Sequence, residues 1–226
     1  MFNMHDPCLL IELGIMGYMK AWSIQKMIAD LRYQDELGDC LILVEHPHTY
    51  TLGRRGKPSD ILVDDLFLKE NDISVYNVDR GGEVTYHGPG QVMVYSIFDV
   101  RKMGGAFGFV NFLEEVTIGT LAKFGVDGTK KENCTGIWIG DAKIAFLGLN
   151  IRRGITTHGF ALNINTDLTY YKYIISCGVP NEKVTSLSSL LGVEVPETEI
   201  IETIKDQFAL NLNREVKKVD LASILG

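Results

Sequence analysis

Hydrophobic and polar positions at the start of the chain predict a strand, a helix and a second strand. Residues 8–13 and 40–44 are apolar runs of strand length, and Cys8 and Cys40 within them are expected to be small buried core residues. Between these runs, residues 18–37 place apolar side chains at helical spacing. Gly38 stands where a glycine commonly ends a helix, so we expect this helix to reach residue 37.

The rest of the chain predicts strands and helices in irregular order. Predicted strands cover residues 50–52, 73–78, 92–98, 137–139, 143–151 and 155–165, and predicted helices cover 64–70, 109–124, 182–191 and 196–212. The last three strands follow one another through short turns, which predicts antiparallel pairing. Because no regular βαβ alternation is present, we expect an α+β fold. No long linker interrupts the pattern, so residues 1–226 are expected to form a single domain, whose final third could still be a small subdomain.

Composition and charge narrow the class of protein. With 226 residues, 46% of them hydrophobic and 23% charged, the chain has the composition of a globular protein with a sizeable core. The formal net charge of −7 argues against nucleic acid as a partner, because phosphate contacts require a basic face. The N-terminal residues 1–13 have no basic region and only a short apolar run, so we expect a cytoplasmic protein without a membrane partner. The four cysteines form no C-x-x-C pair and predict free thiols rather than disulfides or a metal site.

Residues 80–99 are the stretch most unlike an ordinary core segment. They bring Arg80, His87 and Gln91 together with Pro89 and four glycines before the predicted strand 92–98. Glycine allows tight turns and lets the backbone approach a ligand closely. An ordinary hairpin does not need so many glycines, but composition by itself leaves a substrate-binding loop and a plain turn as equal alternatives.

A cysteine and a lysine are the candidates for covalent chemistry. Cys177 ends an apolar run beside a glycine, which would leave room for a substrate carbonyl, but its thiol needs a nearby cation to ionise. An inert buried thiol is the alternative for Cys177, and Cys134, close to two lysines, is a rival nucleophile. Lys143 begins an apolar strand, where it is either a surface residue or a base in an apolar site. Local sequence does not distinguish these alternatives.

Four motifs in order along the chain resemble the lipoyl(octanoyl) transferases, acyltransferases of lipoate biosynthesis within the lipoate/biotin protein ligase fold family. The strongest is R-G-G-E-V-T-Y-H-G-P-G-Q at residues 80–91. G-D-A-K-I-A-F-L-G-L-N-I-R-R-G-I-T-T-H-G-F-A-L-N-I follows at residues 140–164, and C-G before V-T-S-L lies within residues 177–187. H-P-x-x-Y-T-x-G-R at residues 46–54 precedes them. The resemblance therefore covers most of the chain.

The resemblance implies a fold, a reaction and a set of site residues. The implied fold has mixed, largely antiparallel sheets flanked by helices, and the implied reaction is octanoyl transfer through an acyl-cysteine thioester. Cys177 matches the family's nucleophile and Lys143 its catalytic lysine, which takes the proton. Gly88, Pro89 and Gly90 are expected to line the acyl tunnel, and backbone amides around Gly148 and Leu149 to stabilise an oxyanion. The implied substrate-binding residues are Arg80, Gly81, Gly82, Glu83, Val84, Thr85, Tyr86, His87, Gly148, Leu149, Asn150, His158, Gly159 and Phe160.

Partners and cofactors also follow from the resemblance. Octanoyl-acyl carrier protein is the implied donor, and apo lipoyl domains of 2-oxoacid dehydrogenases and the glycine cleavage H protein are the implied acceptors. Because the thioester is already activated, no cofactor, ATP or metal is expected. Docking of these acidic partners is expected at four arginines, with a solvated surface turn as the alternative for the first two: Arg54, Arg55, Arg152 and Arg153.

Some questions stay open from the sequence. An ATP-dependent lipoate ligase or related amidotransferase shares the lysine but lacks the cysteine, and a non-catalytic acyl-binding protein of the same fold is a third possibility. His87 and His158 have either structural roles or contacts with substrate. Ser176 replaces the proline that usually precedes the family's nucleophile, and Glu83 replaces a common glutamine or lysine. We expect neither replacement to remove the chemistry.

Overall fold

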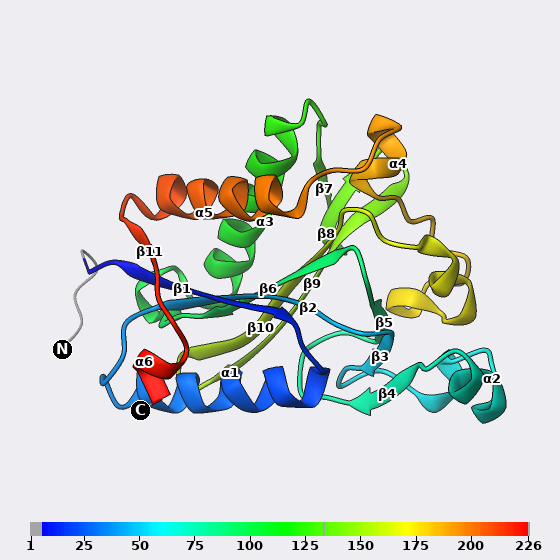
Figure 1. The fold of residues 1–226 in the computed structure, drawn as a ribbon, viewed down its shortest axis with the longest axis horizontal. Coiled ribbons are helices and arrows are strands. Elements are labelled where there is room, and N and C mark those ends of the chain that lie inside the picture. Colours follow the sequence, from blue (N-terminus) through cyan, green and yellow to red (C-terminus); the bar gives the residue numbers. More distant parts are fainter. Residues whose placement is uncertain (1–5, 133, 226) are drawn as a thin grey trace.

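The computed structural model describes residues 6–132 and 134–225 and contains two β-sheets with helices on both sides (Figure 1). Its strands are β1 (Cys8–Ile15), β2 (Cys40–Glu45), β3 (Thr49–Leu52), β4 (Ser74–Asn77), β5 (Val84–His87), β6 (Gln91–Ile97), β7 (Thr129–Lys131), β8 (Cys134–Ile139), β9 (Ala142–Arg152), β10 (Ile155–Asn163) and β11 (Val216–Lys218). Its α-helices are α1 (Tyr18–Tyr33), α2 (Asp65–Glu70), α3 (Gly105–Lys123), α4 (Leu187–Leu191), α5 (Glu197–Leu212) and α6 (Ala222–Leu225).

The larger sheet has eight strands in the order β11-β1-β2-β6-β10-β9-β8-β7. Only β1 pairs with its neighbours in parallel, and the remaining pairs of this sheet are antiparallel. The smaller sheet has the order β4-β3-β5, with β3 parallel to β4 and antiparallel to β5. These mixed, largely antiparallel sheets confirm the predicted α+β class.

Helices cover both faces of the larger sheet because its central strands are apolar on both sides. In β2, Leu41 and Leu43 point into the core shared with α3 and α5, whereas Ile42 and Val44 point into the core shared with α1 and the smaller sheet. Strand side chains alternate between faces, so a continuous apolar run needs cover on each. Figure 1 shows α1 on one side of the sheet and α3 with α5 on the other. Within the described residues, no helix combines the length and apolarity needed to cross a membrane.

Three predicted elements need correction. The first helix ends at Tyr33 and not at residue 37, because Asp35 adopts a left-handed conformation with φ 63° and ends it in a Schellman motif. In that motif the Glu36 amide donates to the Leu31 carbonyl and the Asp35 amide to the Arg32 carbonyl. The helix expected at residues 182–191 begins only at Leu187, since Ser186 caps it and the preceding residues pair with β9.

The third correction concerns residues 80–99. Part of this stretch is strand β5, which pairs with β3 and is fully buried. The loop interpretation therefore holds only for the turns on either side of β5. Strands β7 and β11 were not predicted, because each is only three residues long and gives little pattern.

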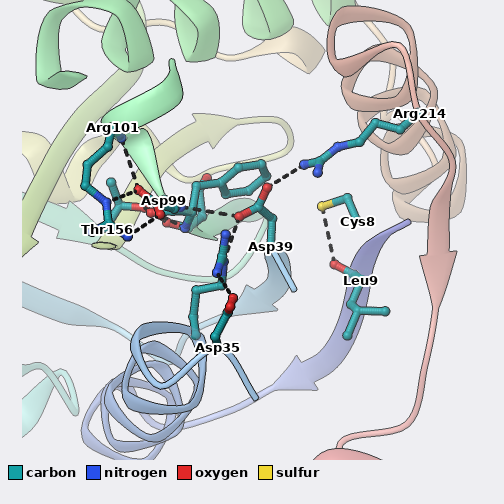
Figure 2. Close-up of polar contacts among 11 residues, drawn as sticks. Cys8, Leu9, Asp35, Asp39, Asp99, Arg101, Thr156 and Arg214 are labelled. Carbon is teal, nitrogen blue, oxygen red and sulfur yellow. Dashed lines mark hydrogen bonds and ion pairs between the residues drawn. The ribbon is translucent and has the colours of Figure 1, made fainter. Parts of the chain in front are cut away.

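Asp39 joins three separate parts of the chain (Figure 2). Its carboxylate accepts hydrogen bonds from Arg32 Nε at 3.0 Å and from Arg214 Nη2 at 2.6 Å. The backbone amide of Asp99 also donates to this carboxylate, at 3.3 Å. All three of the charged side chains are largely buried. The carboxylate of Asp39, just before β2, thus holds three segments: the end of α1, the residues after β6 and the segment leading into β11.

Candidate functional site

Cys177 lies in a short irregular turn, Ser176–Gly178, that follows the last tyrosines of the chain. Its backbone has φ 52° and ψ 24°, the left-handed region that costs a non-glycine residue about 1–2 kcal/mol. Backbone hydrogen bonds on both sides hold the turn, including Ile175 N to Asp60 O at 2.8 Å and Val179 N to Ser176 O at 2.9 Å. The surrounding structure therefore imposes this conformation and leaves the thiol half-buried.

The side chain of Lys143, at the start of β9, points inward to Cys177. Its Nζ atom lies 3.3 Å from Cys177 Sγ and 3.8 Å from Glu182 Oε1. The same ammonium lies 4.8 Å from the centre of the Trp138 ring and 4.9 Å from that of Phe146. Two ring faces and a carboxylate therefore surround the Nζ atom and hold this buried lysine in place beside the thiol.

Backbone pairing explains why this lysine meets this cysteine. Lys143 N donates to Lys183 O at 2.8 Å, and Thr185 N donates to Lys143 O at 2.9 Å. The segment that follows Cys177 therefore runs beside the first residues of β9. Backbone hydrogen bonds thus join the motif that contains Lys143 to the motif that contains Cys177. This pairing keeps the two side chains close together.

Burial is the largest influence on the pKa of Cys177. Burial raises the pKa of the Cys177 thiol above its usual value, the Lys143 ammonium lowers it in part, and the Glu182 carboxylate raises it again. Lys143 is therefore the neighbour that most favours the thiolate. Cys8 and Cys40 are buried core thiols as predicted, and burial raises the pKa of each. Among the described residues Cys177 is the cysteine that accepts a hydrogen bond from an ammonium.

Two cavities meet at Cys177. An inner pocket is lined by residues of α1, β5, β6, β9 and β10 and of the loop before β5. An outer groove lies on its solvent side and includes Lys143, Glu182 and both of Arg54 and Arg55. Cys177 lines both cavities, whereas Lys143 lines only the groove. The thiol can thus bond to a group whose chain lies inside while a second reactant approaches from outside.

The loop before β5 forms one wall of both cavities. Strand β8 pairs with the first residues of β9, up to Ala145. Further along β9 the neighbour is the loop before β5, where Gly81 N donates to Leu149 O at 2.9 Å. Arg80 is buried, and its guanidinium donates to Thr51 Oγ1, to Thr51 O and to Gly81 O. The Gly81 bond holds the loop against β9, and the Arg80 bonds hold it to Thr51 on β3. Gly81, Gly82 and Gly148 line both the pocket and the groove.

Aromatic and polar side chains line the inner pocket together. His158 Nδ1 lies 3.4 Å from the Tyr18 hydroxyl, and His158 Nε2 lies 2.7 Å from Asp79 Oδ1. The ring nitrogens of His87 contact Thr51 Oγ1 and Gln91 Oε1. Burial lowers the pKa of His87 and His158, so both rings are neutral at physiological pH. Both histidines are thus hydrogen-bonded to neighbouring side chains, and both line the pocket.

Most of the expected binding residues lie at these cavities. Leu149 lines the outer groove, and the others line the inner pocket or both cavities: Arg80, Gly81, Gly82, Glu83, Val84, Thr85, His87, Gly148, His158 and Gly159. Three of the expected residues line neither cavity. Tyr86 stacks on Tyr170 on the other side of β5, and Phe160 packs into the core on the opposite face of β10. Asn150 instead hydrogen-bonds Asp79 and Arg54.

Two further expectations differ from the structure. The turn Gly88, Pro89 and Gly90 lines neither cavity and packs near Asn165, because Gly90 N donates to Glu45 and Gly90 O accepts from the backbone of that segment. Of the four arginines expected to dock partners, only Arg54 and Arg55 border the groove. The other two lie at the turn between β9 and β10.

Sequence reasoning missed several lining residues that strand alternation could have found. Gly159 lies opposite Tyr95 and Ala161 opposite Met93 in the pairing of β10 with β6, so all four share the face that lines the pocket. His158 breaks this alternation because its φ is 62°. Inner-pocket residues not predicted are Tyr18, Met93, Tyr95, Phe146, Leu147 and Ala161. Cys134, the rival nucleophile, also lines the groove, and groove residues not predicted are Ala106, Val110, Thr135, Trp138, Ile151, Val179 and Glu182.

Comparison with known proteins agrees with the predicted fold and with the family resemblance. Residues 17–209 match the model of the lipoyl protein ligase A/B catalytic domain. The octanoyltransferase of Caldicellulosiruptor bescii is 41% identical over 221 residues, which cover 94% of this chain and 97% of that protein. The octanoyltransferase of Solibacter usitatus is 41% identical over 203 residues, 89% of this chain and 91% of that protein. A solved structure of the bipartite lipoate protein ligase of Thermoplasma acidophilum superimposes with a TM-score of 0.75 at 19% identity, covering 98% of this chain and 92% of that one.

Proposed function

The chain belongs to the lipoyl protein ligase A/B catalytic-domain family, and on that premise we propose that it is an octanoyltransferase acting through an acyl-cysteine intermediate. The main support for the intermediate is the 3.3 Å distance between Lys143 Nζ and Cys177 Sγ. A nucleophile with a base in hydrogen-bond reach is the arrangement that covalent acyl transfer requires. The position of Cys177 where the pocket and the groove meet supports a reaction with two successive partners.

In the first step, Lys143 takes the thiol proton and the Cys177 thiolate attacks the thioester carbonyl of octanoyl-acyl carrier protein. The bond between Cys177 Sγ and the carbonyl carbon forms, and the bond between that carbon and the carrier sulfur breaks. Lys143 then gives its proton to the departing carrier thiolate. The octanoyl chain occupies the inner pocket, where burial contributes roughly 0.8 kcal/mol per CH₂. The thioester supplies the activation, so the step uses neither ATP nor a metal ion.

In the second step, the target lysine of an apo lipoyl domain enters through the outer groove. Lys143 takes one proton from its ammonium, and the free amine attacks the octanoyl thioester. The new N–C bond forms and the C–S bond to Cys177 breaks. The second proton of the nitrogen goes to the departing Cys177 sulfur, and the first passes from Lys143 to water. The enzyme then has a free thiol again.

The two protein partners differ from each other, but both would approach the same groove. Arg54 and Arg55 are exposed at its border, and Arg55 Nε pairs with Glu83 at 2.8 Å. Exposed arginines next to a reactive cysteine suit the docking of acidic carrier and lipoyl domains, although the chain has a net charge of −7. We propose 2-oxoacid dehydrogenase lipoyl domains and the glycine cleavage H protein as the acceptors.

Intact mass of the protein after mixing with octanoyl-acyl carrier protein, without ATP, tests this function. We expect an added octanoyl mass on the wild type, no added mass on Cys177→Ala, and loss of the adduct when an apo lipoyl domain is supplied. A parallel reaction contains ATP, free octanoate and the lipoyl domain. Octanoyl transfer only in that reaction, with no adduct in the first, would contradict the proposal and indicate an ATP-dependent ligase.

A further inference from the structure

We propose that Glu182 is a positioning residue that enables Lys143 to accept the proton of the incoming amine after Cys177 has been acylated. This inference rests on the proposed function and assigns a role to a residue for which neither the motifs nor the reaction chemistry required one. Glu182 acts through Lys143 and needs no contact with the octanoyl chain.

Geometry is the first argument. Glu182 Oε1 lies 3.8 Å from Lys143 Nζ, and the two side chains are only 11% and 5% exposed. Its other oxygen, Oε2, accepts a hydrogen bond from Ser176 Oγ at 3.0 Å. The carboxylate therefore bridges the residue immediately before the nucleophile and the lysine that handles the proton. Both contacts fix Glu182 within the wall of the outer groove.

The change of charge during the reaction is the second argument. In the free enzyme, a proton moved from Cys177 to Lys143 creates an ammonium beside a thiolate, so the new cation has an anionic neighbour. In the acyl-enzyme the sulfur is part of an uncharged thioester. When Lys143 then takes a proton from the acceptor, Glu182 is the carboxylate within 4 Å of its ammonium among the described residues. Glu182 should therefore matter more for discharge of the acyl-enzyme than for its formation.

The effect of Glu182 on the Cys177 thiol in the free enzyme is the third argument. The Glu182 carboxylate raises the pKa of Cys177, which works against thiolate formation. A carboxylate placed there only to activate the thiol would be counterproductive. Its position is reasonable if its benefit falls in the second half-reaction, when no thiolate exists.

Ser176 supports the placement of Glu182. Its hydroxyl donates to Glu182 Oε2 at 3.0 Å and lies 3.9 Å from Cys177 Sγ. This hydrogen bond holds one carboxylate oxygen while the other lies 3.8 Å from Lys143 Nζ.

The experiment separates the two half-reactions of Glu182→Gln. Single-turnover mixing with octanoyl-acyl carrier protein gives the acylation rate, and mixing of isolated acyl-enzyme with an apo lipoyl domain gives the discharge rate. We expect acylation within about threefold of wild type and discharge slower by about 10- to 100-fold, since loss of the carboxylate removes part of the roughly 10²- to 10⁴-fold that a general base contributes. Glu182→Asp should recover part of the discharge rate, and Ser176→Ala should lose less of it than Glu182→Gln.

A second readout tests charge rather than packing. The rate of Cys177 alkylation by iodoacetamide is measured against pH in the free enzyme. The other groups that act on this thiol are Lys143, Ser176, Arg80 and Tyr171, and none of them is replaced in the variant. Removing the Glu182 charge should lower the pKa of Cys177 and move the alkylation profile to lower pH. Asp141→Asn, which removes an exposed carboxylate paired with Lys183, should change neither the profile nor either half-reaction.

The outcomes are distinct. Discharge at the wild-type rate in Glu182→Gln would overturn the inference, as would an equal loss in both half-reactions, which would indicate a general structural role. An unshifted alkylation profile would also contradict it. If the wild type itself forms no acyl-enzyme, the proposed function fails, and that result comes from a different measurement from the variant's discharge rate.

Discussion

Gly136 leaves free the space that the side chain of Lys143 occupies. A Cβ atom at Gly136 would lie 2.5 Å from Lys143 Cε and 2.7 Å from the Ala145 carbonyl oxygen, closer than real Cβ atoms approach other heavy atoms. The amide of Gly136 donates to the buried Glu114 carboxylate on α3 at 3.2 Å, so the backbone cannot easily move away. The backbone position of β8 at Gly136 therefore leaves the space through which the Lys143 side chain reaches the Cys177 thiol.

Gly136→Ala is expected to displace the Lys143 side chain and lower the rate of acyl-enzyme formation by at least about tenfold. Its φ of 141° adds backbone strain of about 1–3 kcal/mol for any other residue. Rapid-quench measurement of acylation, together with the melting temperature, separates the two effects. Gly140→Ala is the matched control, because its φ of 58° also imposes strain but nothing lies within 4 Å of the added Cβ. Equal acylation rates in the two variants would contradict this role of Gly136.

Replacement of Lys143 by methionine should change both the titration of the thiol and the rate of transfer. The ammonium lowers the pKa of Cys177, so its removal raises that pKa and moves the alkylation profile to higher pH. Transfer should fall by about 10²- to 10⁴-fold, the usual contribution of a general base. Lys183→Met removes an exposed lysine that pairs with Asp141 and should alter neither quantity. An unchanged alkylation profile in Lys143→Met would mean that the lysine does not interact with the thiol in solution.

The inner pocket should set the preferred length of the acyl chain. Ala161 lines this pocket from β10, and leucine there would take space from the last carbons of the substrate. Each CH₂ that can no longer be buried costs roughly 0.8 kcal/mol, or about a fourfold loss in kcat/KM. We therefore expect Ala161→Leu to favour hexanoyl over octanoyl thioesters when the two are compared directly. Phe160→Leu, on the opposite face of β10, should lower stability without changing this ratio.

Asp39 should be important for stability and not for chemistry. Its loss leaves Arg32 and Arg214 without their shared partner, and the side chains of both arginines are only 11% and 8% exposed. We expect Asp39→Ala to lower the free energy of unfolding by about 3 kcal/mol in urea titrations, because a largely buried charge left unpaired is costly. Lys218→Ala removes an exposed ion pair with Glu12 and should cost at most about 1 kcal/mol. A similar loss in both variants would show that the Asp39 contacts contribute little.

The expected site residues illustrate how far sequence reasoning reached. The resemblance identified Cys177 and Lys143, but the local sequence left open whether the lysine faced solvent or the thiol. The set of binding residues implied by the resemblance includes consecutive strand residues, such as Tyr86 after Thr85 and Phe160 after Gly159. Neighbouring strand residues point to opposite faces. Applying that alternation would have excluded Tyr86 and Phe160.

Glu182 and Tyr18 could not have been found in the same way. Glu182 lies in an irregular segment that the sequence suggested was helical, and no motif gave it a role. Tyr18 is the first residue of a surface-type helical pattern, yet it is 2% exposed because the start of α1 packs against the histidines of the pocket. Their functions depend on which segments meet in space, which periodicity does not encode.

The sequence by itself determined the main strands and helices, the α+β class and the family. These properties follow from local backbone preference, from the alternation of apolar positions and from motif wording, all of which are read within short windows. Only the tertiary structure decided that Lys143 reaches a thiol 34 residues later, that Glu182 approaches the same ammonium, and that pocket and groove meet at one cysteine. The physical reason is that such distances depend on sheet register and on the path of the chain between strands, which packing of the whole molecule sets.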